Sequence, residues 1–578
     1  MIFDILFLGG LAFFLAIISV LLCRAKYSAG GYILVIGLGI FCLGLQLASK
    51  FPFLMDVKHH NFFYTALGYA AGREFPPENP FAAGMPASFP WLTFFIYTQI
   101  SHVLGLSPGL IAKIVGILCS VIAVTSVVTM VSVWDSQRQS MSAVKVGVVV
   151  MVFFAGTIFW GSFPKIGINP IGHPLAGGWW ESRGLPVINC FQNFTFPIGL
   201  GAALFGYAAF ILSLVKGNSL LRNFLIFLGT AFSAFYPFAW LALGLSVAGA
   251  SIAALFRHVH HKVLFTSLIF CGIGAVLAYF YISSLRPEGA CPPFAVDLDF
   301  GQLVLEGRLI IFYQSILCLA CLVNLKFFVK EWKSGQAFPF LLLGSVLAIN
   351  LATLGIRFLD HTDYKLWVFA AIFLGVLAAP SFTSAVRQFP VWTVLILTIL
   401  LLPLSRTILQ DTLGVRRMEP PLKIASDGSQ LKILDKNLQE PYTWISENTP
   451  KDSVVIEQSY TLAPIFANRS IFIGSHKERT KLELFGFTTP VEIWLSEFCG
   501  FGDVFVKRRL DLIEELFSGT PSDECIKTIC SEVPGRSVFV LFRFARIEGE
   551  LPFNNFDSKF VPAASGDTWK LYKIEPMF

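Results

Sequence analysis

Asp56 and His60 are the first residues in the chain whose types and spacing could do chemistry. They follow an apolar segment that ends near Ala48. If that segment spans a membrane, the Asp56 carboxylate at its edge is partly desolvated, which suits it to act as a general base. On a helix, a spacing of four puts both side chains on one face, where they could share a proton network or bind a metal ion. The alternative is an ordinary loop whose charges meet lipid headgroups.

A second candidate segment runs from Arg357 to Lys365, with five ionisable side chains in nine residues between two apolar runs. Ionisable groups at a membrane edge are costly and are functional candidates by default. Arg357 and Lys365 could neutralise a phosphate, and the arginine could hold it through two parallel hydrogen bonds. The alternative is an ion-paired loop that only caps two helices.

Two further segments hold polar candidates. Glu181 and Arg183 follow a pair of tryptophans, which could form an aromatic belt at the interface or stack on a sugar. In the second case Glu181 and Arg183 could hold hydroxyls or phosphate. Glu78 and Asn79 lie in a proline-rich stretch, and Pro80 and its neighbours are expected to stiffen a turn there.

The composition decides what kind of protein must position these residues. Of the 578 residues, 55% are apolar and 14% are charged, and the mean hydropathy is +0.68. A soluble globular protein has about 25% charged residues, so a water-soluble enzyme and a disordered chain are both excluded. The net charge is +6, and no Lys/Arg-dense run indicates a nucleic-acid surface. The chain is therefore predicted to be a polytopic membrane protein.

A membrane-spanning helix needs about 20 mainly apolar residues, and the sequence predicts about twelve such spans. The short segment Trp91–Leu106 is predicted instead to be a helix lying at, or dipping into, the outer interface. The predicted spans are Phe3–Cys23, Tyr32–Ala48, Leu110–Trp134, Val146–Ser162, Phe194–Val215, Phe224–Phe238, Ala239–Phe256, Val263–Ser283, Leu309–Val329, Phe338–Leu354, Leu366–Pro380 and Val391–Leu404.

The short loops between the spans indicate the orientation. Basic residues gather in alternate loops, and the positive-inside rule makes that side cytoplasmic. The longer loops with Asp56, Glu181 and Asp363 then face outward, together with everything after about Arg406. The basic residues are Arg24, Lys26, Arg138, Lys145, Lys216, Arg222, Arg257, Lys262, Lys330, Lys333 and Arg387.

The composition becomes charged and mixed near Arg406, which predicts two domains. Residues 1–408 are expected to form a transmembrane helical bundle, with a catalytic first outward loop at 50–90. Residues 409–578 are expected to form a small soluble extracytoplasmic α/β domain, with alternating segments at Ser453–Glu457, Ser470–Gly474 and Ser537–Phe542. The predicted fold is therefore mainly α, and the predicted location is the plasma (inner) membrane.

These segments together resemble the GT-C superfamily of polytopic membrane glycosyltransferases. Asp56 and His60 match an outward Asp-x-x-x-His that follows a span in that superfamily. The run Pro77–Gly84 matches the Pro-x-Asn-Pro-x-x-x-Gly motif that comes next. The segment Asp363–Lys365 is similar to an Asp-Asn-x-Lys motif, one residue shorter and without the asparagine. The segment Trp444–Ser453 resembles the outer domain that often closes such chains.

The resemblance implies a catalytic mechanism. The first-loop acidic residue is catalytic in GT-C enzymes, and that role falls on Asp56, with His60 beside it. The donor is a polyprenyl-phosphate-linked sugar in the lipid bilayer, and the acceptor is a glycan, a lipid or a protein. The sugar moves in one step with inversion while Lys365, Arg357 or Arg183 stabilises the developing phosphate charge.

The resemblance also implies the remaining substrate contacts, which fall on Glu78, Asn79, Glu181 and Asp363. Metal use differs among GT-C enzymes, so a divalent cation, Mg²⁺ or Mn²⁺, close to Asp56, His60 and Glu78 is left open. No other cofactor is implied.

Two other functions are open from the sequence, and a non-enzymatic assembly scaffold is the residual possibility. A transporter or flippase for lipid-linked glycans would show internal repeats and matching broken helices, and Pro237 has no counterpart in a second half. A polysaccharide polymerase or ligase would also use outward arginines. It would differ from a glycosyltransferase in whether a monosaccharide lipid donor is consumed.

Overall fold

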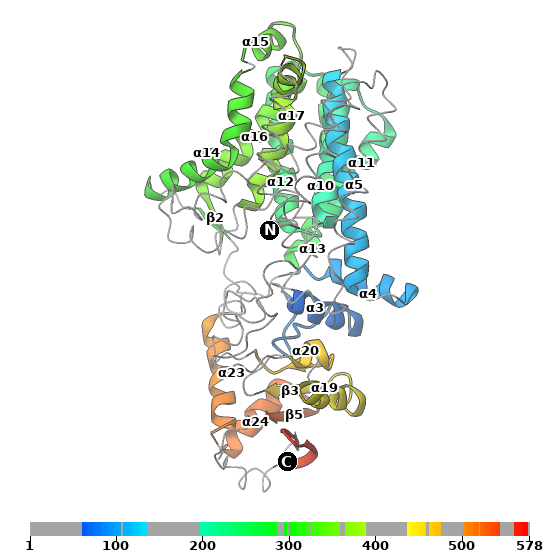
Figure 1. The fold of residues 1–578 in the computed structure, drawn as a ribbon, viewed down its shortest axis with the longest axis vertical. Coiled ribbons are helices and arrows are strands. Elements are labelled where there is room, and N and C mark those ends of the chain that lie inside the picture. Colours follow the sequence, from blue (N-terminus) through cyan, green and yellow to red (C-terminus); the bar gives the residue numbers. More distant parts are fainter. Residues whose placement is uncertain are drawn as a thin grey trace, which may run out of the picture. The chain divides into compact units, whose positions relative to one another are not determined.

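The chain forms two compact units in the computed structural model shown in Figure 1. The helical unit contains the described residues of Lys113–Ile282 and Phe294–Arg416. The mixed unit contains those of Phe51–Ala112, Ser283–Pro293 and Arg417–Phe578. The boundary predicted at residue 408 lies outside the described residues and stays a prediction. The described residues are 61–88, 90–105, 108–135, 197–285, 294–296, 300–323, 325–358, 364–388, 436–457, 462–474, 501–518, 521–543 and 560–575.

The helical unit is built from long apolar helices and one short strand pair. Among the described residues, five helices are long and apolar enough to cross a membrane, namely α5, α10, α12, α13 and α16. The elements are α5 (Pro108–Asp135), α10 (Pro197–Lys216), α11 (Leu220–Ser233), α12 (Pro237–Phe256), α13 (His261–Ser283), β1 (Phe294–Val296), α14 (Phe300–Val323), α15 (Leu325–Lys333), α16 (Phe338–Gly355), β2 (Ile356–Phe358) and α17 (Tyr364–Gln388).

A mainly helical fold with apolar spans is therefore confirmed, and the five helices coincide with five of the predicted spans. The spans predicted at Phe3–Cys23, Tyr32–Ala48, Val146–Ser162 and Val391–Leu404 lie outside the described residues. The number of about twelve spans stays a prediction.

The span predicted at Leu309–Val329 has the wrong bounds. The structure begins α14 at Phe300 and starts a separate helix, α15, at Leu325. Gln302, Glu306 and Arg308 near the start of α14 lower its hydropathy without weakening the helix, because Gln, Glu and Arg are all good helix formers. In α15, Val329 and Trp332 leave an apolar face 47% and 55% exposed, with lysines on the other face. Such a helix fits a membrane interface rather than a span.

Small residues let the helices of the helical unit approach closely. A Cβ atom at Gly249 of α12 would overlap the main-chain oxygen of Gly344 in α16. At the same crossing, the Ser345 hydroxyl donates to the Ser246 oxygen at 2.6 Å and lies 2.5 Å from the Tyr207 hydroxyl. Close contact between small residues, with hydroxyls bonded across helices, is how helices associate in membranes.

The outer surface of this unit is apolar. On α13, Phe265, Ile273 and Phe280 are 67%, 50% and 66% exposed. A water-soluble protein rarely leaves such a continuous apolar surface uncovered. It is the surface expected of a helix that faces lipid tails.

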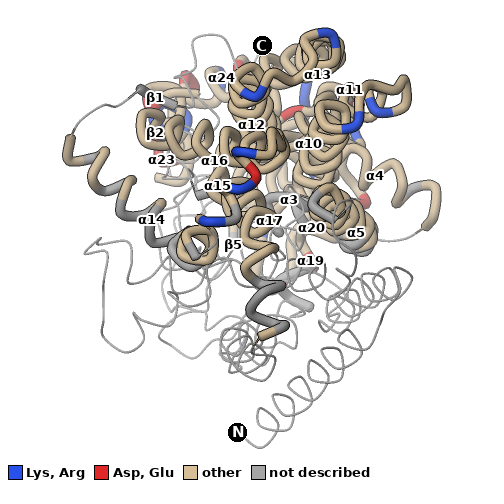
Figure 2. The backbone as a smooth tube through the Cα atoms, turned by 90° about the horizontal axis from the view of Figure 1, so that it is seen from above, with Lys and Arg blue, Asp and Glu red and all other residues tan. Residues whose placement is uncertain are grey.

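Arg257 ties together two of the basic loops. It follows the last residue of α12, and its guanidinium donates to the Trp332 oxygen at 3.0 Å and to the Gln336 oxygen at 3.4 Å. It also lies over the rings of Trp332 and Phe340, at 4.6 and 4.8 Å from their centroids. The α12–α13 and α15–α16 connections therefore lie at one end of the unit, and Figure 2 views this end, with blue positions on α11 and α15.

A third basic connection joins the same end. The Asn218 side chain, between α10 and α11, donates to the Val263 oxygen at 3.3 Å and accepts from the Ser267 hydroxyl at 3.1 Å. The predicted clustering on one side is thus confirmed for the three connections that carry Lys216 and Arg222, Arg257 and Lys262, and Lys330 and Lys333. That this side is cytoplasmic stays a prediction.

The mixed unit contains a five-stranded sheet in the order β4-β3-β5-β7-β6. The interior strand β3 is parallel to its neighbours β4 and β5 and is buried throughout, while β5, β7 and β6 run antiparallel to one another in turn. The alternating segments at Ser453–Glu457 and Ser537–Phe542 form β3 and β5, whereas only the first two residues of Ser470–Gly474 form a strand, β4. The elements are α3 (Asn61–Arg73), α4 (Leu92–Leu104), α19 (Lys436–Asn448), β3 (Val454–Glu457), α20 (Ala463–Phe466), β4 (Ser470–Ile471), α23 (Asp503–Leu516), α24 (Asp523–Glu532), β5 (Val538–Arg543), β6 (Val561–Gly566) and β7 (Trp569–Ile574).

The α12–α16 crossing yields a prediction for stability. We expect Gly249→Ala to destabilise the protein by about 1–3 kcal/mol, because the added methyl group has no room beside Gly344. At Gly244, also on α12, a methyl group would point into open space with no neighbouring atom within 4 Å, so Gly244→Ala is the matched control and should be neutral or slightly stabilising. Thermal unfolding of both variants in detergent checks this. An equal midpoint for the two variants would contradict it.

Candidate functional site

The predicted site residues are only partly within the described chain. Glu78 and Asn79 lie in the mixed unit, whereas Arg357 and Lys365 lie in the helical unit. The described residues thus include the adjacent pair Glu78 and Asn79. They also show at which end of the helical unit Arg357 lies. The candidates outside the described residues are Asp56, His60, Glu181, Arg183 and Asp363.

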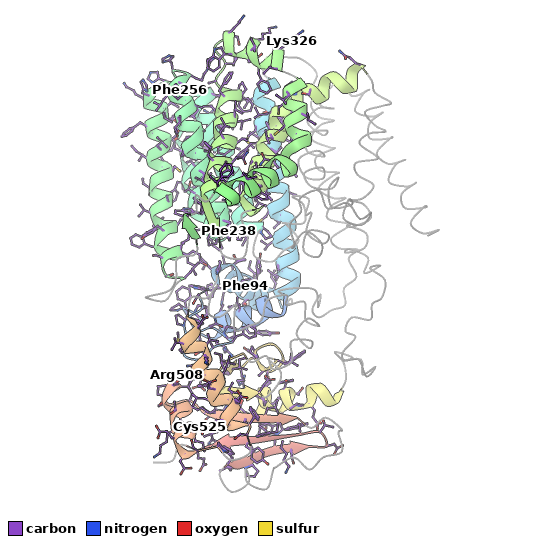
Figure 3. The ribbon with its side chains drawn as sticks, turned by 90° about the vertical axis from the view of Figure 1, so that its left-hand side faces the viewer. Phe94, Phe238, Phe256, Lys326, Arg508 and Cys525 are labelled. Carbon is purple, nitrogen blue, oxygen red and sulfur yellow. The ribbon has the colours of Figure 1, made fainter. Side chains whose placement is uncertain are left out.

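Arg357 lies at the end of the helical unit away from the basic connections. Helices α12 and α16 are antiparallel, because Gly249 meets Gly344 while Arg257 meets Phe340. In Figure 3, Phe256 lies towards one end of this unit and Phe238 towards the other. Strand β2 follows α16 directly, and its Arg357 pairs with a residue of β1.

Lys365 is the second residue of α17 and follows β2 closely. The connection from the end of β2 at Phe358 to the start of α17 at Tyr364 is short, and it can span at most about 20 Å. Helix α16, with 18 residues, is about 27 Å long. The start of α17 therefore cannot reach the level of the basic connections. The Ser381 hydroxyl of α17 donates to the Ala320 oxygen, close to the end of α14 that leads into α15. Lys365 lies about 24 Å before Ser381 along α17, so it belongs to the same half of the unit as Arg357.

The stretch after α3 forms the predicted turn, which we call the Pro77–Ala87 turn. It is closed by hydrogen bonds from the Asn79 amide to the Met85 oxygen at 2.7 Å and from the Ala87 amide to the Pro77 oxygen at 2.9 Å. The Asn79 side chain is fully buried, and its Oδ1 accepts the Phe81 amide at 2.9 Å. Asn79 thus stabilises the turn, and its predicted substrate contact stays a prediction.

The outer part of this turn lies along β4 as an added strand. The Ile471 amide donates to the Pro80 oxygen at 3.0 Å, and the Ala83 amide donates to the Ile471 oxygen at 2.9 Å. The Gly474 amide donates to the Phe81 oxygen at 2.9 Å. Phe81 and Ala83 are almost completely buried. The Pro77–Ala87 turn is therefore part of the sheet of the mixed unit in its hydrogen bonding.

Arg509 holds the turn from the other side. It lies on α23, is 2% exposed, and donates through Nη1 to the oxygens of Ala83 and Phe472, at 2.7 and 2.6 Å. Its Nε donates to Glu532 at 2.6 Å. The guanidinium also lies over the rings of Phe472 and Phe505, at 4.4 and 4.6 Å. A buried arginine of this kind needs both its ion pair and its hydrogen bonds to be stable.

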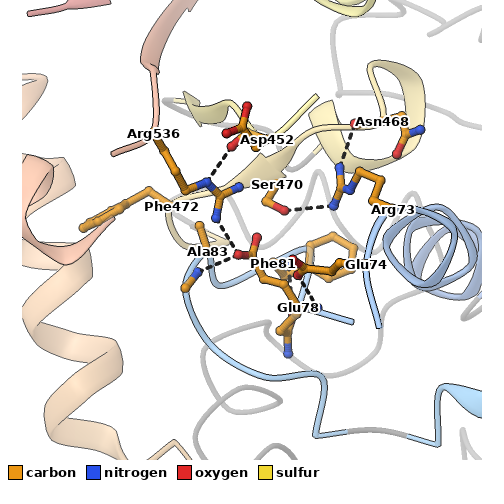
Figure 4. Close-up of polar contacts among 12 residues, drawn as sticks. Arg73, Glu74, Glu78, Phe81, Ala83, Asp452, Asn468, Ser470, Phe472 and Arg536 are labelled. Atoms are coloured by element: carbon orange, nitrogen blue, oxygen red, sulfur yellow. Dashed lines mark hydrogen bonds and ion pairs between the residues drawn. The ribbon is translucent and has the colours of Figure 1, made fainter. Parts of the chain in front are cut away.

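Two further arginines hold the turn and the end of α3, as Figure 4 shows. Arg536 forms an ion pair with Glu78, whose Oε2 also accepts the Gly84 amide at 3.0 Å. Arg73, the last residue of α3, donates to the Asn468 oxygen at 2.7 Å and to the Ser470 hydroxyl at 2.9 Å. Glu78 is thus engaged in the structure of the turn, and its substrate contact also stays a prediction.

Burial affects the protonation of these arginines. It lowers the pKa of Arg73 to about 10, while Glu78 raises that pKa and Arg536 lowers it. Burial likewise lowers the pKa of Arg509, and the hydrogen bond to Glu532 opposes this. Both guanidinium groups are therefore poorly hydrated cations, whose positions depend on the protein groups that replace water.

These arginines were missed by the sequence analysis, although one signal for Arg509 was available. The buried face of α23 consists of Val506, Arg509, Ile513 and Leu516 at helical spacing. An arginine inside an apolar stripe is unusual and indicates a paired, buried charge. Arg73 and Arg536 carry no such pattern, because their partners are distant in sequence.

The described residues give no support for a metal ion. None of them form a group of three or more His, Cys, Asp or Glu side chains that could hold one. Glu78 Oε1 is buried without a hydrogen-bond partner among the described residues, but Arg536 and Arg73 place positive charge beside it, which disfavours a divalent cation. The other two candidate ligands, Asp56 and His60, lie outside the described residues.

Comparisons with known proteins give two likenesses in structure. Crystalline ArnT from Cupriavidus metallidurans, bound to undecaprenyl phosphate, aligns over 95% of this chain and 98% of its own, with 11% identity and a TM-score of 0.45. An Archaeoglobus fulgidus oligosaccharyltransferase, in complex with Zn and sulfate, aligns over 88% of this chain and 67% of its own, with 10% identity and a TM-score of 0.38. No family model and no curated protein matches the chain.

At these identities and TM-scores, the two structural likenesses assign no activity, substrate or residue role to this chain.

The two arginines that share Glu532 give a matched pair for a prediction. We expect Arg509→Gln to lower the free energy of unfolding of the mixed unit by about 3–5 kcal/mol, because it leaves Glu532 Oε2 and the main-chain oxygens of Ala83 and Phe472 without their donor. Arg508 also pairs with Glu532, but its side chain is 59% exposed, so Arg508→Gln should cost about 1 kcal/mol or less. Urea unfolding monitored by proteolysis of the mixed unit measures both. Equal losses would show that burial does not set the strength of these contacts.

Proposed function

We propose that this chain is a GT-C-type glycosyltransferase of the plasma (inner) membrane. It transfers a sugar from a polyprenyl-phosphate-linked donor to a glycan, lipid or protein acceptor on the extracytoplasmic face. The transfer inverts the anomeric carbon, and Asp56 is the general base.

The observation that carries this proposal is the polarity of the helical unit. Three basic connections meet at one end through Arg257 and Asn218. Arg357 lies at the other end, and Lys365 belongs to the same half. By the positive-inside rule, the basic end faces the cytoplasm and the Arg357 end faces outward. A lipid phosphate at the outer interface would then meet the cations expected to bind it.

The chemistry follows from the residue types. The Asp56 carboxylate accepts the proton of the acceptor hydroxyl while that oxygen attacks the anomeric carbon. The bond from that carbon to the phosphate oxygen breaks, and the polyprenyl phosphate leaves. Arg357 and Lys365 stabilise the charge that develops on the phosphate, which is a preorganised electrostatic role. His60 follows Asp56 by four positions, a spacing that a helix would place on one face, and in this proposal it shares the proton network.

The Asp56 assignment predicts a large loss of activity on a neutral substitution. In Asp56→Asn the side chain keeps its shape but cannot accept a proton, so we expect the transfer rate to fall by about 10²–10⁴-fold. Asp511→Asn is the control, because Asp511 is exposed on α23. The measurement is consumption of a panel of radiolabelled polyprenyl-phosphate sugars by the purified protein in lipid, with a membrane-extract acceptor.

The alternatives give different results in the same assay. A transporter or flippase would move the labelled lipid between leaflets of a vesicle and release no polyprenyl phosphate. A polymerase or ligase would consume lipid-linked oligosaccharide rather than a monosaccharide donor. Full transfer by Asp56→Asn would remove Asp56 as the base.

A further inference from the structure

The end of the helical unit where the three basic connections meet is a positive surface, which we call the basic surface. In Figure 3, Lys326 and Phe256 both lie towards this end. The sequence has no Asp or Glu between Pro197 and Leu285, and Glu331 of α15 is buried. Among the described residues, no carboxylate pairs with any of the exposed lysines of this surface. These lysines are Lys216, Lys262, Lys326, Lys330 and Lys333.

Large apolar side chains are exposed at the same end of the unit. They lie at the start of α11, at the end of α12 and on α15, and each is more than half exposed. A nucleic acid offers phosphates without an apolar layer beside them. A bilayer offers both, because its charged headgroups lie directly over its acyl chains. The apolar residues are Leu220, Leu221, Phe256, Leu325 and Trp332.

Helix α15 presents charge and apolar surface on two separate stripes. Its Phe328 packs against the core of the helical unit. Two stripes of three exposed side chains run along the rest of the helix, each with spacings of four and three, which place its members on one face. The apolar stripe is Leu325, Val329 and Trp332, and the basic stripe is Lys326, Lys330 and Lys333. A helix of this pattern lies in the plane of a membrane interface.

The basic surface continues directly into the surface that faces lipid tails. Lys262 is the second residue of α13, and Phe265, less than one turn further along, is 67% exposed. A spacing of three places both side chains on one side of the helix. The lysines therefore lie where a surface suited to acyl chains ends, which is the level of the headgroups.

We propose that the basic surface binds anionic phospholipid headgroups, with α15 lying in the interface at its centre. The lysines contact the headgroup phosphates, and the apolar stripe of α15 contacts the acyl chains below them. Each lysine close to an anionic bilayer strengthens binding about fivefold, and salt weakens the attraction by screening it. This inference does not depend on the proposed glycosyl transfer, and it holds whichever side of the membrane the basic surface faces.

The test measures which lipids the full-length protein retains. Protein in detergent is equilibrated with equal amounts of phosphatidylglycerol and phosphatidylcholine that carry the same acyl chains, and the bound lipids are counted by native mass spectrometry. We expect the wild type to retain phosphatidylglycerol over phosphatidylcholine by about fivefold or more. The triple variant Lys326→Gln/Lys330→Gln/Lys333→Gln should lower this ratio by about threefold or more, because it removes the basic stripe of α15.

A matched control removes the same charge elsewhere. Lys451, Lys507 and Lys527 are exposed lysines of the mixed unit, and Lys451→Gln/Lys507→Gln/Lys527→Gln should leave the ratio unchanged. Equal ratios in the two triple variants would overturn the proposal. Arginine in place of the three lysines of α15 keeps the cations and should keep the ratio. Loss of the ratio in that variant too would show that charge is not the cause, and would also overturn it.

Two further measurements distinguish a bilayer from a soluble anion. The variant Leu325→Gln/Val329→Gln keeps every lysine but should retain about threefold less phosphatidylglycerol, because the apolar stripe no longer contacts acyl chains. Glycerol phosphate, which is a headgroup without acyl chains, should not displace the retained lipid. If retention is insensitive to the apolar pair, or if glycerol phosphate displaces the lipid, the surface binds a soluble anion, an acidic protein or a nucleic acid, and the proposal is overturned.

Discussion

The hydrogen bonds between Pro80–Ala83 and β4 are the interaction on which the mixed unit depends. Strand β4 has only two residues and lies at the edge of the sheet, where its outer amide and carbonyl groups need partners. The Pro77–Ala87 turn supplies them, and Arg509 satisfies the carbonyl groups of Ala83 and Phe472. The sheet edge and the turn are therefore parts of one structure. Either of them alone would have main-chain polar groups with no hydrogen-bond partner.

The helical unit is stabilised by different forces. Its interior crossings rely on small residues in close contact, as at Gly206 and Gly229, and on hydroxyl hydrogen bonds such as that of Ser345. Its described charged contacts, such as that of Arg257, lie at the basic end. This separation is expected where lipid surrounds the middle of a helix bundle and water reaches its ends.

The sequence was sufficient to predict the parts that depend on local patterns. The lengths of the apolar runs predicted α5, α10, α12, α13 and α16, and segments of alternating character predicted β3 and β5. Polar residues in the first turns of α14 concealed its true start. Nothing local indicates that Pro80–Ala83 would join β4, because that pairing depends on residues far apart in the chain.

The same limit applies to the candidate site. The turn that contains Glu78 and Asn79 could be predicted from its prolines. The sequence did not indicate that both side chains would stabilise the turn itself. Arg509 was detectable from the apolar stripe of α23. Arg73 was not, since its partners are the main-chain oxygen of Asn468 and one hydroxyl, which no sequence pattern singles out.

The long sequence separation between Ala83 and Arg509 has a consequence for how this protein folds during its synthesis. Their hydrogen bond joins residues 426 positions apart. At about 5–20 residues per second, a ribosome needs about 20–90 s to make the intervening chain. For most of that time the Pro77–Ala87 turn has no sheet to join, because β3 and β4 lie beyond residue 453, so a nascent chain cannot complete the mixed unit until these strands and α23 have been synthesised.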